Sequence, residues 1–237
     1  MSKFLEYSSF EIRKTLTSDS GMRFPYTDSH TVTYSYQSKA SAMHPVLNRN
    51  LYLVKEHVGM FKASYNFDIF DLETGEEIIN CREPKLGAIA KMLRFTGYKR
   101  MTPFNVELRT VSGDLVLSVE RGVSLFLSKV DVRDNDGDRI GGFKQKFFSI
   151  GGAFRVLGEN DEELCALKGK WTGWDFRFMA GETELAHVTK KWAGLGKEMF
   201  TSADNYVLEI SEDVPPDNPL RELIVAAVMC IDMVLKE

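Results

Sequence analysis

The chain closes with Leu220-Arg-Glu-Leu-Ile-Val-Ala-Ala-Val-Met-Cys-Ile-Asp-Met-Val-Leu-Lys-Glu237, a stretch whose apolar side chains would occupy every face of a helix. Such a helix must be surrounded on all sides, either by a bilayer or by folded protein. Residues 220–235 would rise about 24 Å, whereas the hydrocarbon core of a bilayer is roughly 30 Å thick. Arg221 and Asp232 would also be costly inside lipid. We therefore predict a helix enclosed by protein.

Short alternating runs separated by Asp, Asn and Gly turns fill the chain upstream of this helix. We count about twelve of them, at residues 51–56, 67–71, 77–82, 104–109, 115–120, 124–132, 139–144, 154–157, 164–168, 174–179, 184–189 and 206–210. Two alternating runs around such a turn indicate a β-hairpin, and many short antiparallel strands in one unit indicate a sandwich or a barrel. A barrel of this strand number leaves room for a helix about 10–12 Å across.

The predicted fold class is therefore mainly β, a closed antiparallel barrel of about 12 strands that encloses the C-terminal hydrophobic α-helix. We place the helix at residues 219–236, because Asn218 is a good N-cap and Pro219 suits the first helical position. A second helix is expected from Pro84 to Phe95, where apolar residues recur at helical spacing.

Two regions of different composition divide the chain. Residues 1–45 are rich in Ser, Thr and Tyr, and we expect a poorly ordered or peripheral extension there. Residues 46–237 form the single barrel domain, with strand-like patterning beginning at residues 44–47. Translation could start at Met1 or at Met43, and the sequence leaves both open.

Overall composition is that of an ordinary globular protein, with 43% hydrophobic and 27% charged residues and a net charge of −4. This charge gives no general attraction to nucleic acid, and we expect no nucleic-acid partner. The N-terminus lacks the apolar core of a signal peptide. Three cysteines fit neither a disulfide framework nor a zinc site. We expect a cytoplasmic protein that can associate peripherally with the membrane.

No active-site motif is visible. The four histidines are scattered, and there is no nucleophile elbow and no phosphate-binding glycine loop. We expect His57 and His187 to be half-buried strand residues rather than catalysts. The acidic run at residues 134–138 is predicted to be a hairpin turn rather than a calcium loop, and Asp232 to be buried and paired.

Basic residues interleaved with aromatic residues are a better lead. They gather at residues 94–100, 144–146 and 168–171, and on a strand Lys144 and Lys146 would share one face. Such cations could hold phosphoinositide head groups while Trp171 or Trp174 enters the interface, although a solvated lysine face is the simpler alternative. The candidate head-group residues are Arg94, Lys99, Arg100, Lys144, Lys146, Lys168 and Lys170.

The segment Lys190-Lys-Trp-Ala-Gly-Leu-Gly-Lys-Glu-Met-Phe-Thr-Ser-Ala-Asp-Asn-Tyr206, followed by the apolar helix, resembles the C-terminal half of the phospholipid scramblase family. The resemblance covers approximately residues 45–237. That family shares the tubby-like C-terminal fold with the plant LURP-one-related proteins. The resemblance thus implies a twelve-stranded barrel around a central hydrophobic helix, in agreement with the independent strand count.

The resemblance also implies a calcium-binding segment, which in the family begins Thr-Asp-Ala-Asp-Asn-aromatic. Here Ser202 replaces the first aspartate of that pattern. The candidate calcium residues are Asp204, Asn205, Glu209 and Asp213. The proline-rich region and the acylated cysteine cluster of eukaryotic scramblases have no counterpart, so we expect no lipid anchor of that type.

These observations leave three hypotheses of function. The first is a non-catalytic tubby-like module, without a cofactor, that binds membrane phospholipid, phosphoinositide or a protein partner. The alternative is a scramblase that moves lipids between bilayer leaflets, possibly with calcium, which would require the helix to leave its enclosure. An enzyme with a site assembled from distant residues is the third, and no motif supports it.

Overall fold

A computed structural model of the chain describes residues 43–57, 66–84, 103–122, 129–145, 154–170, 174–190 and 205–231. The described elements are η1 (Pro45–Leu47), β1 (Leu51–Glu56), β2 (Asn66–Asp71), β3 (Glu77–Arg82), β4 (Phe104–Thr110), β5 (Leu115–Arg121), β6 (Lys129–Arg133), β7 (Arg139–Gln145), β8 (Phe154–Leu157), β9 (Glu163–Lys170), β10 (Asp175–Ala180), β11 (Thr183–Thr189), β12 (Asn205–Ile210) and α2 (Leu220–Cys230).

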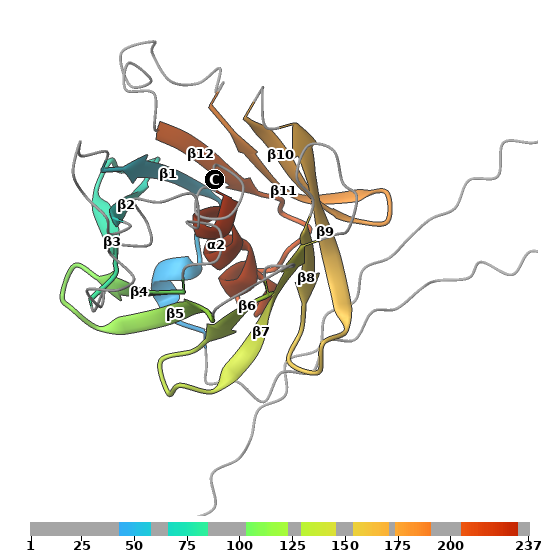
Figure 1. The fold of residues 1–237 in the computed structure, drawn as a ribbon. Helices are drawn as coiled ribbons and strands as arrows, with labels where there is room; N and C mark the ends of the chain where they lie inside the picture. Colours follow the sequence, from blue (N-terminus) through green and yellow to red (C-terminus); the bar gives the residue numbers. More distant parts are fainter. Residues whose placement is uncertain are drawn as a thin grey trace, which may run out of the picture.

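The twelve strands close into one antiparallel barrel. Each strand pairs with its neighbours in sequence, and β1 pairs with β12 to complete the ring. Figure 1 looks along the barrel, with α2 inside the ring of strands. This confirms the predicted fold class. The fold forms because sequential hairpins place neighbouring strands side by side and closure removes the exposed strand edges.

Alternation along the strands determines which side chains fill the barrel. On β4, Phe104, Val106 and Leu108 are buried while Asn105 between them is exposed, which is the period of two expected for a strand with one buried face. Every residue of α2 from Leu220 to Cys230 is buried. The apolar core inside the barrel is therefore formed by the inward-facing side chains of the strands together with the helix.

Close packing of the helix against β7 depends on a glycine. A β-carbon built at Gly141 would lie 3.0 Å from the Cδ2 atom of Leu223. The same β-carbon would lie only 2.3 Å from the backbone carbonyl oxygen of Leu157 on β8, closer than real β-carbons come, so a side chain there would collide with β8 and also crowd the helix.

The helix begins one residue later than predicted, at Leu220, with Pro219 as its N-cap. The side-chain oxygen of Asn218 accepts a hydrogen bond from the backbone N–H of Leu220, at 2.8 Å, and Pro219 immediately precedes the first helical residue. Residues 232–237, including Asp232, lie outside the described part of the chain. Among the described residues, the structure has no helix long and apolar enough to cross a membrane.

Arg221 anchors the first turn of α2. Its guanidinium is 1% exposed and donates hydrogen bonds to the carbonyl oxygens of Val214 (2.6 Å), Pro215 (2.7 Å) and Arg49 (2.7 Å), and to the side-chain oxygen of Asn50 (2.7 Å). A buried charge is tolerated when its donors are satisfied in this way. These bonds fasten the helix both to the segment that precedes it and to the residues before β1.

Residues 44–47 differ from the prediction. They form the short 3-10 helix η1 rather than a strand, because Pro45 suits a helical first turn and the Nδ1 atom of His44 accepts the backbone N–H of Val46 at 3.2 Å. Leu47 is fully buried in the core. Residues 1–42, and residues 85–95 of the second expected helix, lie outside the described part of the chain.

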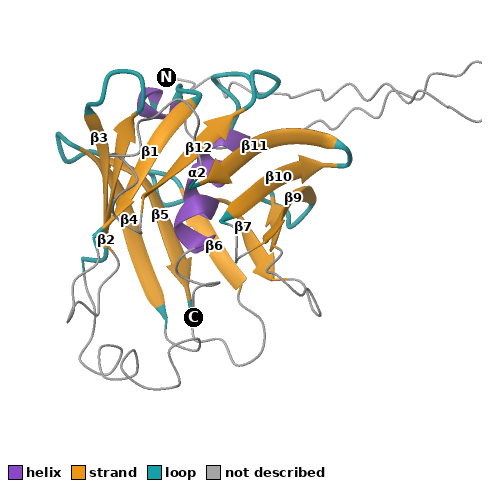
Figure 2. Ribbon diagram, turned by 90° about the horizontal axis from the view of Figure 1, so that it is seen from above, coloured by secondary structure: helices purple, strands orange, loops and turns teal. Residues whose placement is uncertain are grey.

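The strand directions give the barrel two distinct ends. The first end, called the turn rim, holds five hairpin connections and the segment that leads into α2 (Figure 2). The connections are residues 72–76, 111–114, 134–138, 158–162 and 181–182, and the segment before α2 is residues 211–219. At the second end, called the far rim, lie the other strand ends. These are Glu56, Asn66, Arg82, Phe104, Arg121, Lys129, Gln145, Phe154, Lys170, Asp175, Thr189 and Asn205.

Candidate functional site

The turn rim is strongly acidic. The six connections that form it contain no lysine or arginine. Their carboxylates are Glu73, Glu76, Asp114, Asp134, Asp136, Asp138, Glu159, Asp161, Glu162, Glu182, Glu212, Asp213 and Asp217. Lys129 and Arg139 pair with Asp161, which compensates part of this charge, and the remaining carboxylates would repel an anionic surface.

A row of three cations crosses neighbouring strands on the outside of the barrel, close to the far rim. Lys144 of β7 lies opposite Lys129 of β6 on one side and opposite Arg155 of β8 on the other. Neighbouring strands lie about 4.8 Å apart, so like charges placed opposite one another repel. The row therefore attracts anions, whether they come from the protein or from a ligand.

Two members of the row already have carboxylate partners. Lys129 pairs with Asp161 at 3.5 Å, and Arg155 pairs with Glu163 at 3.3 Å. Lys144 is exposed and has no ion pair with any described residue. An anionic ligand could therefore approach Lys144 without first displacing a described carboxylate.

Lys168 of β9 has the same character. It lies opposite Arg177, which is itself paired with Glu184 (2.6 Å) and Asp175 (3.5 Å). Lys168 is exposed and has no ion pair within the described part of the chain. Because Arg155 lies opposite Ala166, two residues before Lys168, the register places Lys144 and Lys168 roughly 12 Å apart on the outer face.

We call Lys144, Arg155 and Lys168 the basic patch. Their flexible side chains could converge on one phosphorylated head group, which presents several oxygens to cations. Two of the three have no described carboxylate partner. The patch is therefore a candidate site for an external anion.

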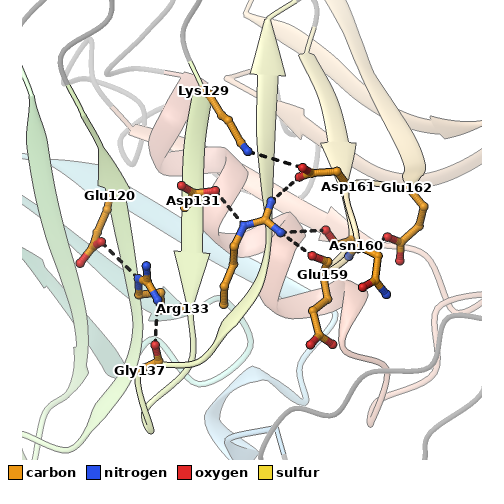
Figure 3. Close-up of polar contacts among 11 residues, drawn as sticks. Glu120, Lys129, Asp131, Arg133, Gly137, Glu159, Asn160, Asp161 and Glu162 are labelled. Carbon is orange, nitrogen blue, oxygen red and sulfur yellow. Dashed lines mark hydrogen bonds and ion pairs between the residues drawn. The ribbon is translucent and has the colours of Figure 1, made fainter.

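Most other cations of this surface serve the scaffold. Arg139 binds Asp131 (2.8 Å) and Asp161 (2.6 Å), and although burial acts in the opposite direction, these carboxylates raise the pKa of its guanidinium. Arg133 binds Glu120 at 3.3 Å and the carbonyl of Gly137 at 3.0 Å. Figure 3 shows how these pairs join β5, β6 and the turn between β8 and β9. Such saturated cations are less available to a ligand.

The structure places two of the predicted head-group residues as expected from alternation. Lys144 and Lys168 are exposed, while the adjacent Phe143 and Leu167 are buried. For Lys170 only its strand position is described. Four predicted residues lie outside the described part of the chain. They are Arg94, Lys99, Arg100 and Lys146.

Arg155 is a patch residue that the sequence analysis missed. Its signal was present, because alternation in Phe154-Arg-Val-Leu157 already directs the arginine outward. Trp171 lies outside the described residues. Trp174 is stacked on Tyr206, with ring centroids 5.5 Å apart, and the Lys190 ammonium lies 3.9 Å above its ring, so this tryptophan is already engaged within the protein.

The candidate calcium residues are not brought together. Asn205 and Glu209 lie four residues apart on β12, which separates their α-carbons by about 13 Å, and Asp213 lies further along on the turn rim. Calcium is bound by six to eight oxygens at 2.3–2.6 Å. Asp204 lies outside the described residues, within which no three His, Cys, Asp or Glu side chains gather as metal ligands.

The acidic run at residues 134–138 is a hairpin turn, as predicted. The Oδ1 atom of Asp134 accepts the backbone N–H groups of Asp136 (3.0 Å) and Asp138 (2.9 Å). The carboxylate is therefore turned toward its own loop.

The two histidines of interest belong to charge pairs. His187 is half-buried on β11 and pairs with Asp175 at 2.9 Å, as expected for a strand residue. His57 was wrongly predicted to be half-buried. It lies exposed just beyond β1, because it reaches outward to Asp68, which also binds Arg82. Burial alone would raise the pKa of Asp68, but its hydrogen bonds with His57 and Arg82 lower it.

The three cysteines, Cys81, Cys165 and Cys230, are buried and not bonded to one another. Burial raises the pKa of each thiol above its ordinary value. Since the thiolate is the reactive form, these cysteines are poor nucleophiles.

Comparisons with known proteins agree with the family resemblance. A family model described as Scramblase matches residues 48–237. An X-ray structure of a protein from Arabidopsis thaliana is similar, with 16% identity, a TM-score of 0.47, and coverage of 82% of this chain and 98% of that one. No curated protein sequence matches the chain. Since the family model spans most of the sequence, the chain belongs to the Scramblase family.

Proposed function

We propose that this protein is a non-catalytic barrel module that binds anionic phospholipid head groups, phosphoinositides in particular, at a membrane surface. The observation that carries the proposal is the basic patch of Lys144, Arg155 and Lys168 near the far rim, on a barrel whose turn rim is acidic. Such a charge distribution would turn the far rim toward an anionic membrane and the turn rim away from it.

The sequence adds support from the far rim. Residues 85–102 join the far-rim ends of β3 and β4, and they contain no acidic residue. Their basic residues are Lys85, Lys91, Arg94, Lys99 and Arg100. Each lysine or arginine close to an anionic membrane contributes about 1 kcal/mol of attraction, so several acting together would hold a peripheral protein.

Lipid movement between leaflets is the second candidate, because the chain belongs to the Scramblase family. The position of α2 favours binding without transfer. Extracting the helix would expose eleven buried residues and break the hydrogen bonds of Arg221. Each Leu, Ile or Val that moves from the core into water loses about 1.5–3 kcal/mol of burial free energy. Only a bilayer whose thickness matches the helix could compensate for this loss.

Sedimentation with vesicles tests the proposal. The full chain should bind vesicles of phosphatidylcholine containing phosphatidylinositol bisphosphate, bind vesicles of phosphatidylcholine alone much less, and lose affinity as salt is added. Equal sedimentation with both kinds of vesicle would contradict the proposal. A fluorescent-lipid transfer assay on the same vesicles, with and without calcium, separates binding from scrambling.

Variants locate the binding surface. Replacing Lys144 and Lys168 together by Gln should weaken vesicle binding by about tenfold or more, since two attractive charges are removed. The matched control replaces Arg109 and Arg133, whose ion pairs lie beside the turn rim. It removes the same charge and should leave binding nearly unchanged. Similar losses in both double variants would indicate that only net charge matters.

A further inference from the structure

Asp161, in the turn between β8 and β9, carries a carboxylate that reaches two neighbouring strands. It pairs with Lys129 of β6 at 3.5 Å and with Arg139 of β7 at 2.6 Å. Figure 3 shows the Lys129 ammonium directed at Asp161. Lys129 lies directly opposite Lys144 of the basic patch. A carboxylate of the protein itself therefore holds a cation that borders the surface proposed for phosphate binding.

The two ion pairs of Asp161 differ in how firmly they are held. The side chain of Arg139 is 22% exposed and has two further partners, the Asp131 carboxylate at 2.8 Å and the carbonyl oxygen of Glu159 at 2.5 Å. In the pair with Lys129, both side chains are about half exposed, at 51% and 54%. An exposed pair of this kind contributes little to stability. Lys129 can therefore leave Asp161 at little cost, while Arg139 continues to neutralise the carboxylate.

The turn that carries Asp161 is closed by its own backbone. The N–H of Asp161 donates to the carbonyl oxygen of Gly158 at 3.1 Å, and the N–H of Gly158 donates to the carbonyl oxygen of Glu162 at 2.9 Å. Asp161 has a φ of +63°, in the left-handed region that Asp and Asn tolerate better than other residues with a β-carbon. Asp161→Asn therefore keeps the turn and removes only the charge.

We propose that Asp161 is an internal competitor for the anion site, holding Lys129 until a phosphate takes its place. This inference rests on the proposed function and concerns the occupancy of the same surface. A phosphate monoester carries more negative charge than a carboxylate and presents three acceptor oxygens, so a phosphate bound at Lys144 attracts Lys129 more strongly than Asp161 does.

The exchange of partners requires little movement. Opposite residues on neighbouring antiparallel strands have their β-carbons about 5 Å apart, so the ammonium groups of Lys129 and Lys144 can reach one phosphate by rotation of their flexible side chains. With the ligand bound, Lys129 joins the basic patch as a fourth cation. Without the ligand, Asp161 keeps this cation neutralised.

Vesicle sedimentation of the full chain tests the competitor. Asp161→Asn should bind vesicles that contain phosphatidylinositol bisphosphate about three- to fivefold more tightly than wild type, because it frees one cation near the membrane. The matched control is Glu162→Gln, which removes the same charge from the same turn. Glu162 has no ion pair with a described cation and accepts the backbone N–H of Asn160, so this control should tighten binding by less than about twofold.

The gain from Asp161→Asn should depend on Lys129. In a chain that already carries Lys129→Gln, adding Asp161→Asn should change the affinity for these vesicles no more than Glu162→Gln does. A gain that persists without Lys129 would overturn the proposal. An equal gain from Glu162→Gln in the wild-type chain would also overturn it, because either result means that only net charge matters.

A soluble probe separates this proposal from the proposed membrane function. Inositol trisphosphate, titrated into the same chains in a calorimeter, presents phosphates without a bilayer. A gain that depends on Lys129 with this probe, but no binding to vesicles, would support the competitor and contradict the membrane function. Vesicle binding that Asp161→Asn leaves unchanged would overturn the competitor alone. Failure of the wild-type chain to bind either probe would overturn both.

Discussion

The two ends of the barrel differ in charge and in how they are built. At the turn rim, short hairpin turns rich in carboxylates surround the anchored start of α2, with Arg221 and Glu222 both buried there. Toward the far rim, the outer strand surface carries the basic patch, where Lys144 and Lys168 have no described carboxylate partner. The difference separates an end where buried polar groups fix the helix from an outer surface whose cations we propose as the binding site.

The largest effect is expected from Arg221→Ala at the anchored end. The substitution leaves the carbonyl groups of Val214 and Arg49 without their side-chain donor, so we expect a loss of about 3–5 kcal/mol in the free energy of unfolding. Urea denaturation measures it. Arg109→Ala, which removes an exposed ion pair, should cost less than about 1 kcal/mol and serves as control.

The pH dependence of stability is expected from Glu222, at the turn-rim end of α2. The pKa of Glu222 is about 8 in the folded protein, above its ordinary value of 4.5, so the folded state retains a proton that the unfolded chain releases. The free energy of unfolding should therefore decrease between about pH 4.5 and pH 8, by at most about 1.4 kcal/mol per pH unit, and level off above. Urea denaturation at several pH values measures this slope.

The titration of Asp68 does not contribute to the change in stability between about pH 4.5 and pH 8. Its pKa is lowered in the folded protein, so the stability it contributes is present above its ordinary pKa of 3.8 and is lost only as pH falls below that value. A rise in stability from pH 5 to pH 8 would contradict the assignment of Glu222.

Gly141→Ala should have a smaller effect on stability. The added methyl would collide with the backbone carbonyl of Leu157 on β8 and crowd Leu223 on the helix, which shifts the packed elements apart and costs about 1–3 kcal/mol. Gly122→Ala is the matched control, since a β-carbon there meets nothing within 4 Å. Equal unfolding midpoints for the two variants would show that the helix does not depend on this close approach.

The smallest effects belong to single charges of the basic patch. Lys144→Gln and Lys168→Gln should each weaken binding to phosphoinositide vesicles by about 1 kcal/mol without changing the unfolding midpoint, because both side chains are exposed. Arg155→Gln should have a weaker effect, since Glu163 already neutralises this arginine. A larger loss of vesicle affinity for Arg155→Gln than for either lysine variant would mean that pairing with a carboxylate does not decide which cation contributes most.

Much of this fold could be predicted from the sequence, because its signals are local. Alternation located eleven strands to within two residues, the run predicted at 124–132 overlaps β6, and a helix apolar on every face required an enclosure. The partners of Arg221 were not predictable, since they include the backbone carbonyl of Arg49, 172 positions away, which has no side-chain signature.

The candidate site was less predictable than the fold. Strand alternation correctly turned Lys144 and Lys168 outward, but only the register between strands shows that Arg155 lies beside Lys144. Sequence likewise cannot separate free cations from those that serve the scaffold. Arg133 and Arg139 look equally available in the sequence, yet carboxylates of neighbouring strands and turns bind them.

Lipid photocrosslinking tests the central claim most directly. The full chain is bound to vesicles that contain a photoreactive phosphoinositide, and the modified peptides are identified by mass spectrometry. We predict crosslinks on peptides from β7 to β9 near Lys144 and Lys168, and none within residues 220–231. Crosslinks concentrated within residues 220–231 would show that the helix leaves the barrel for the bilayer, which would contradict the account.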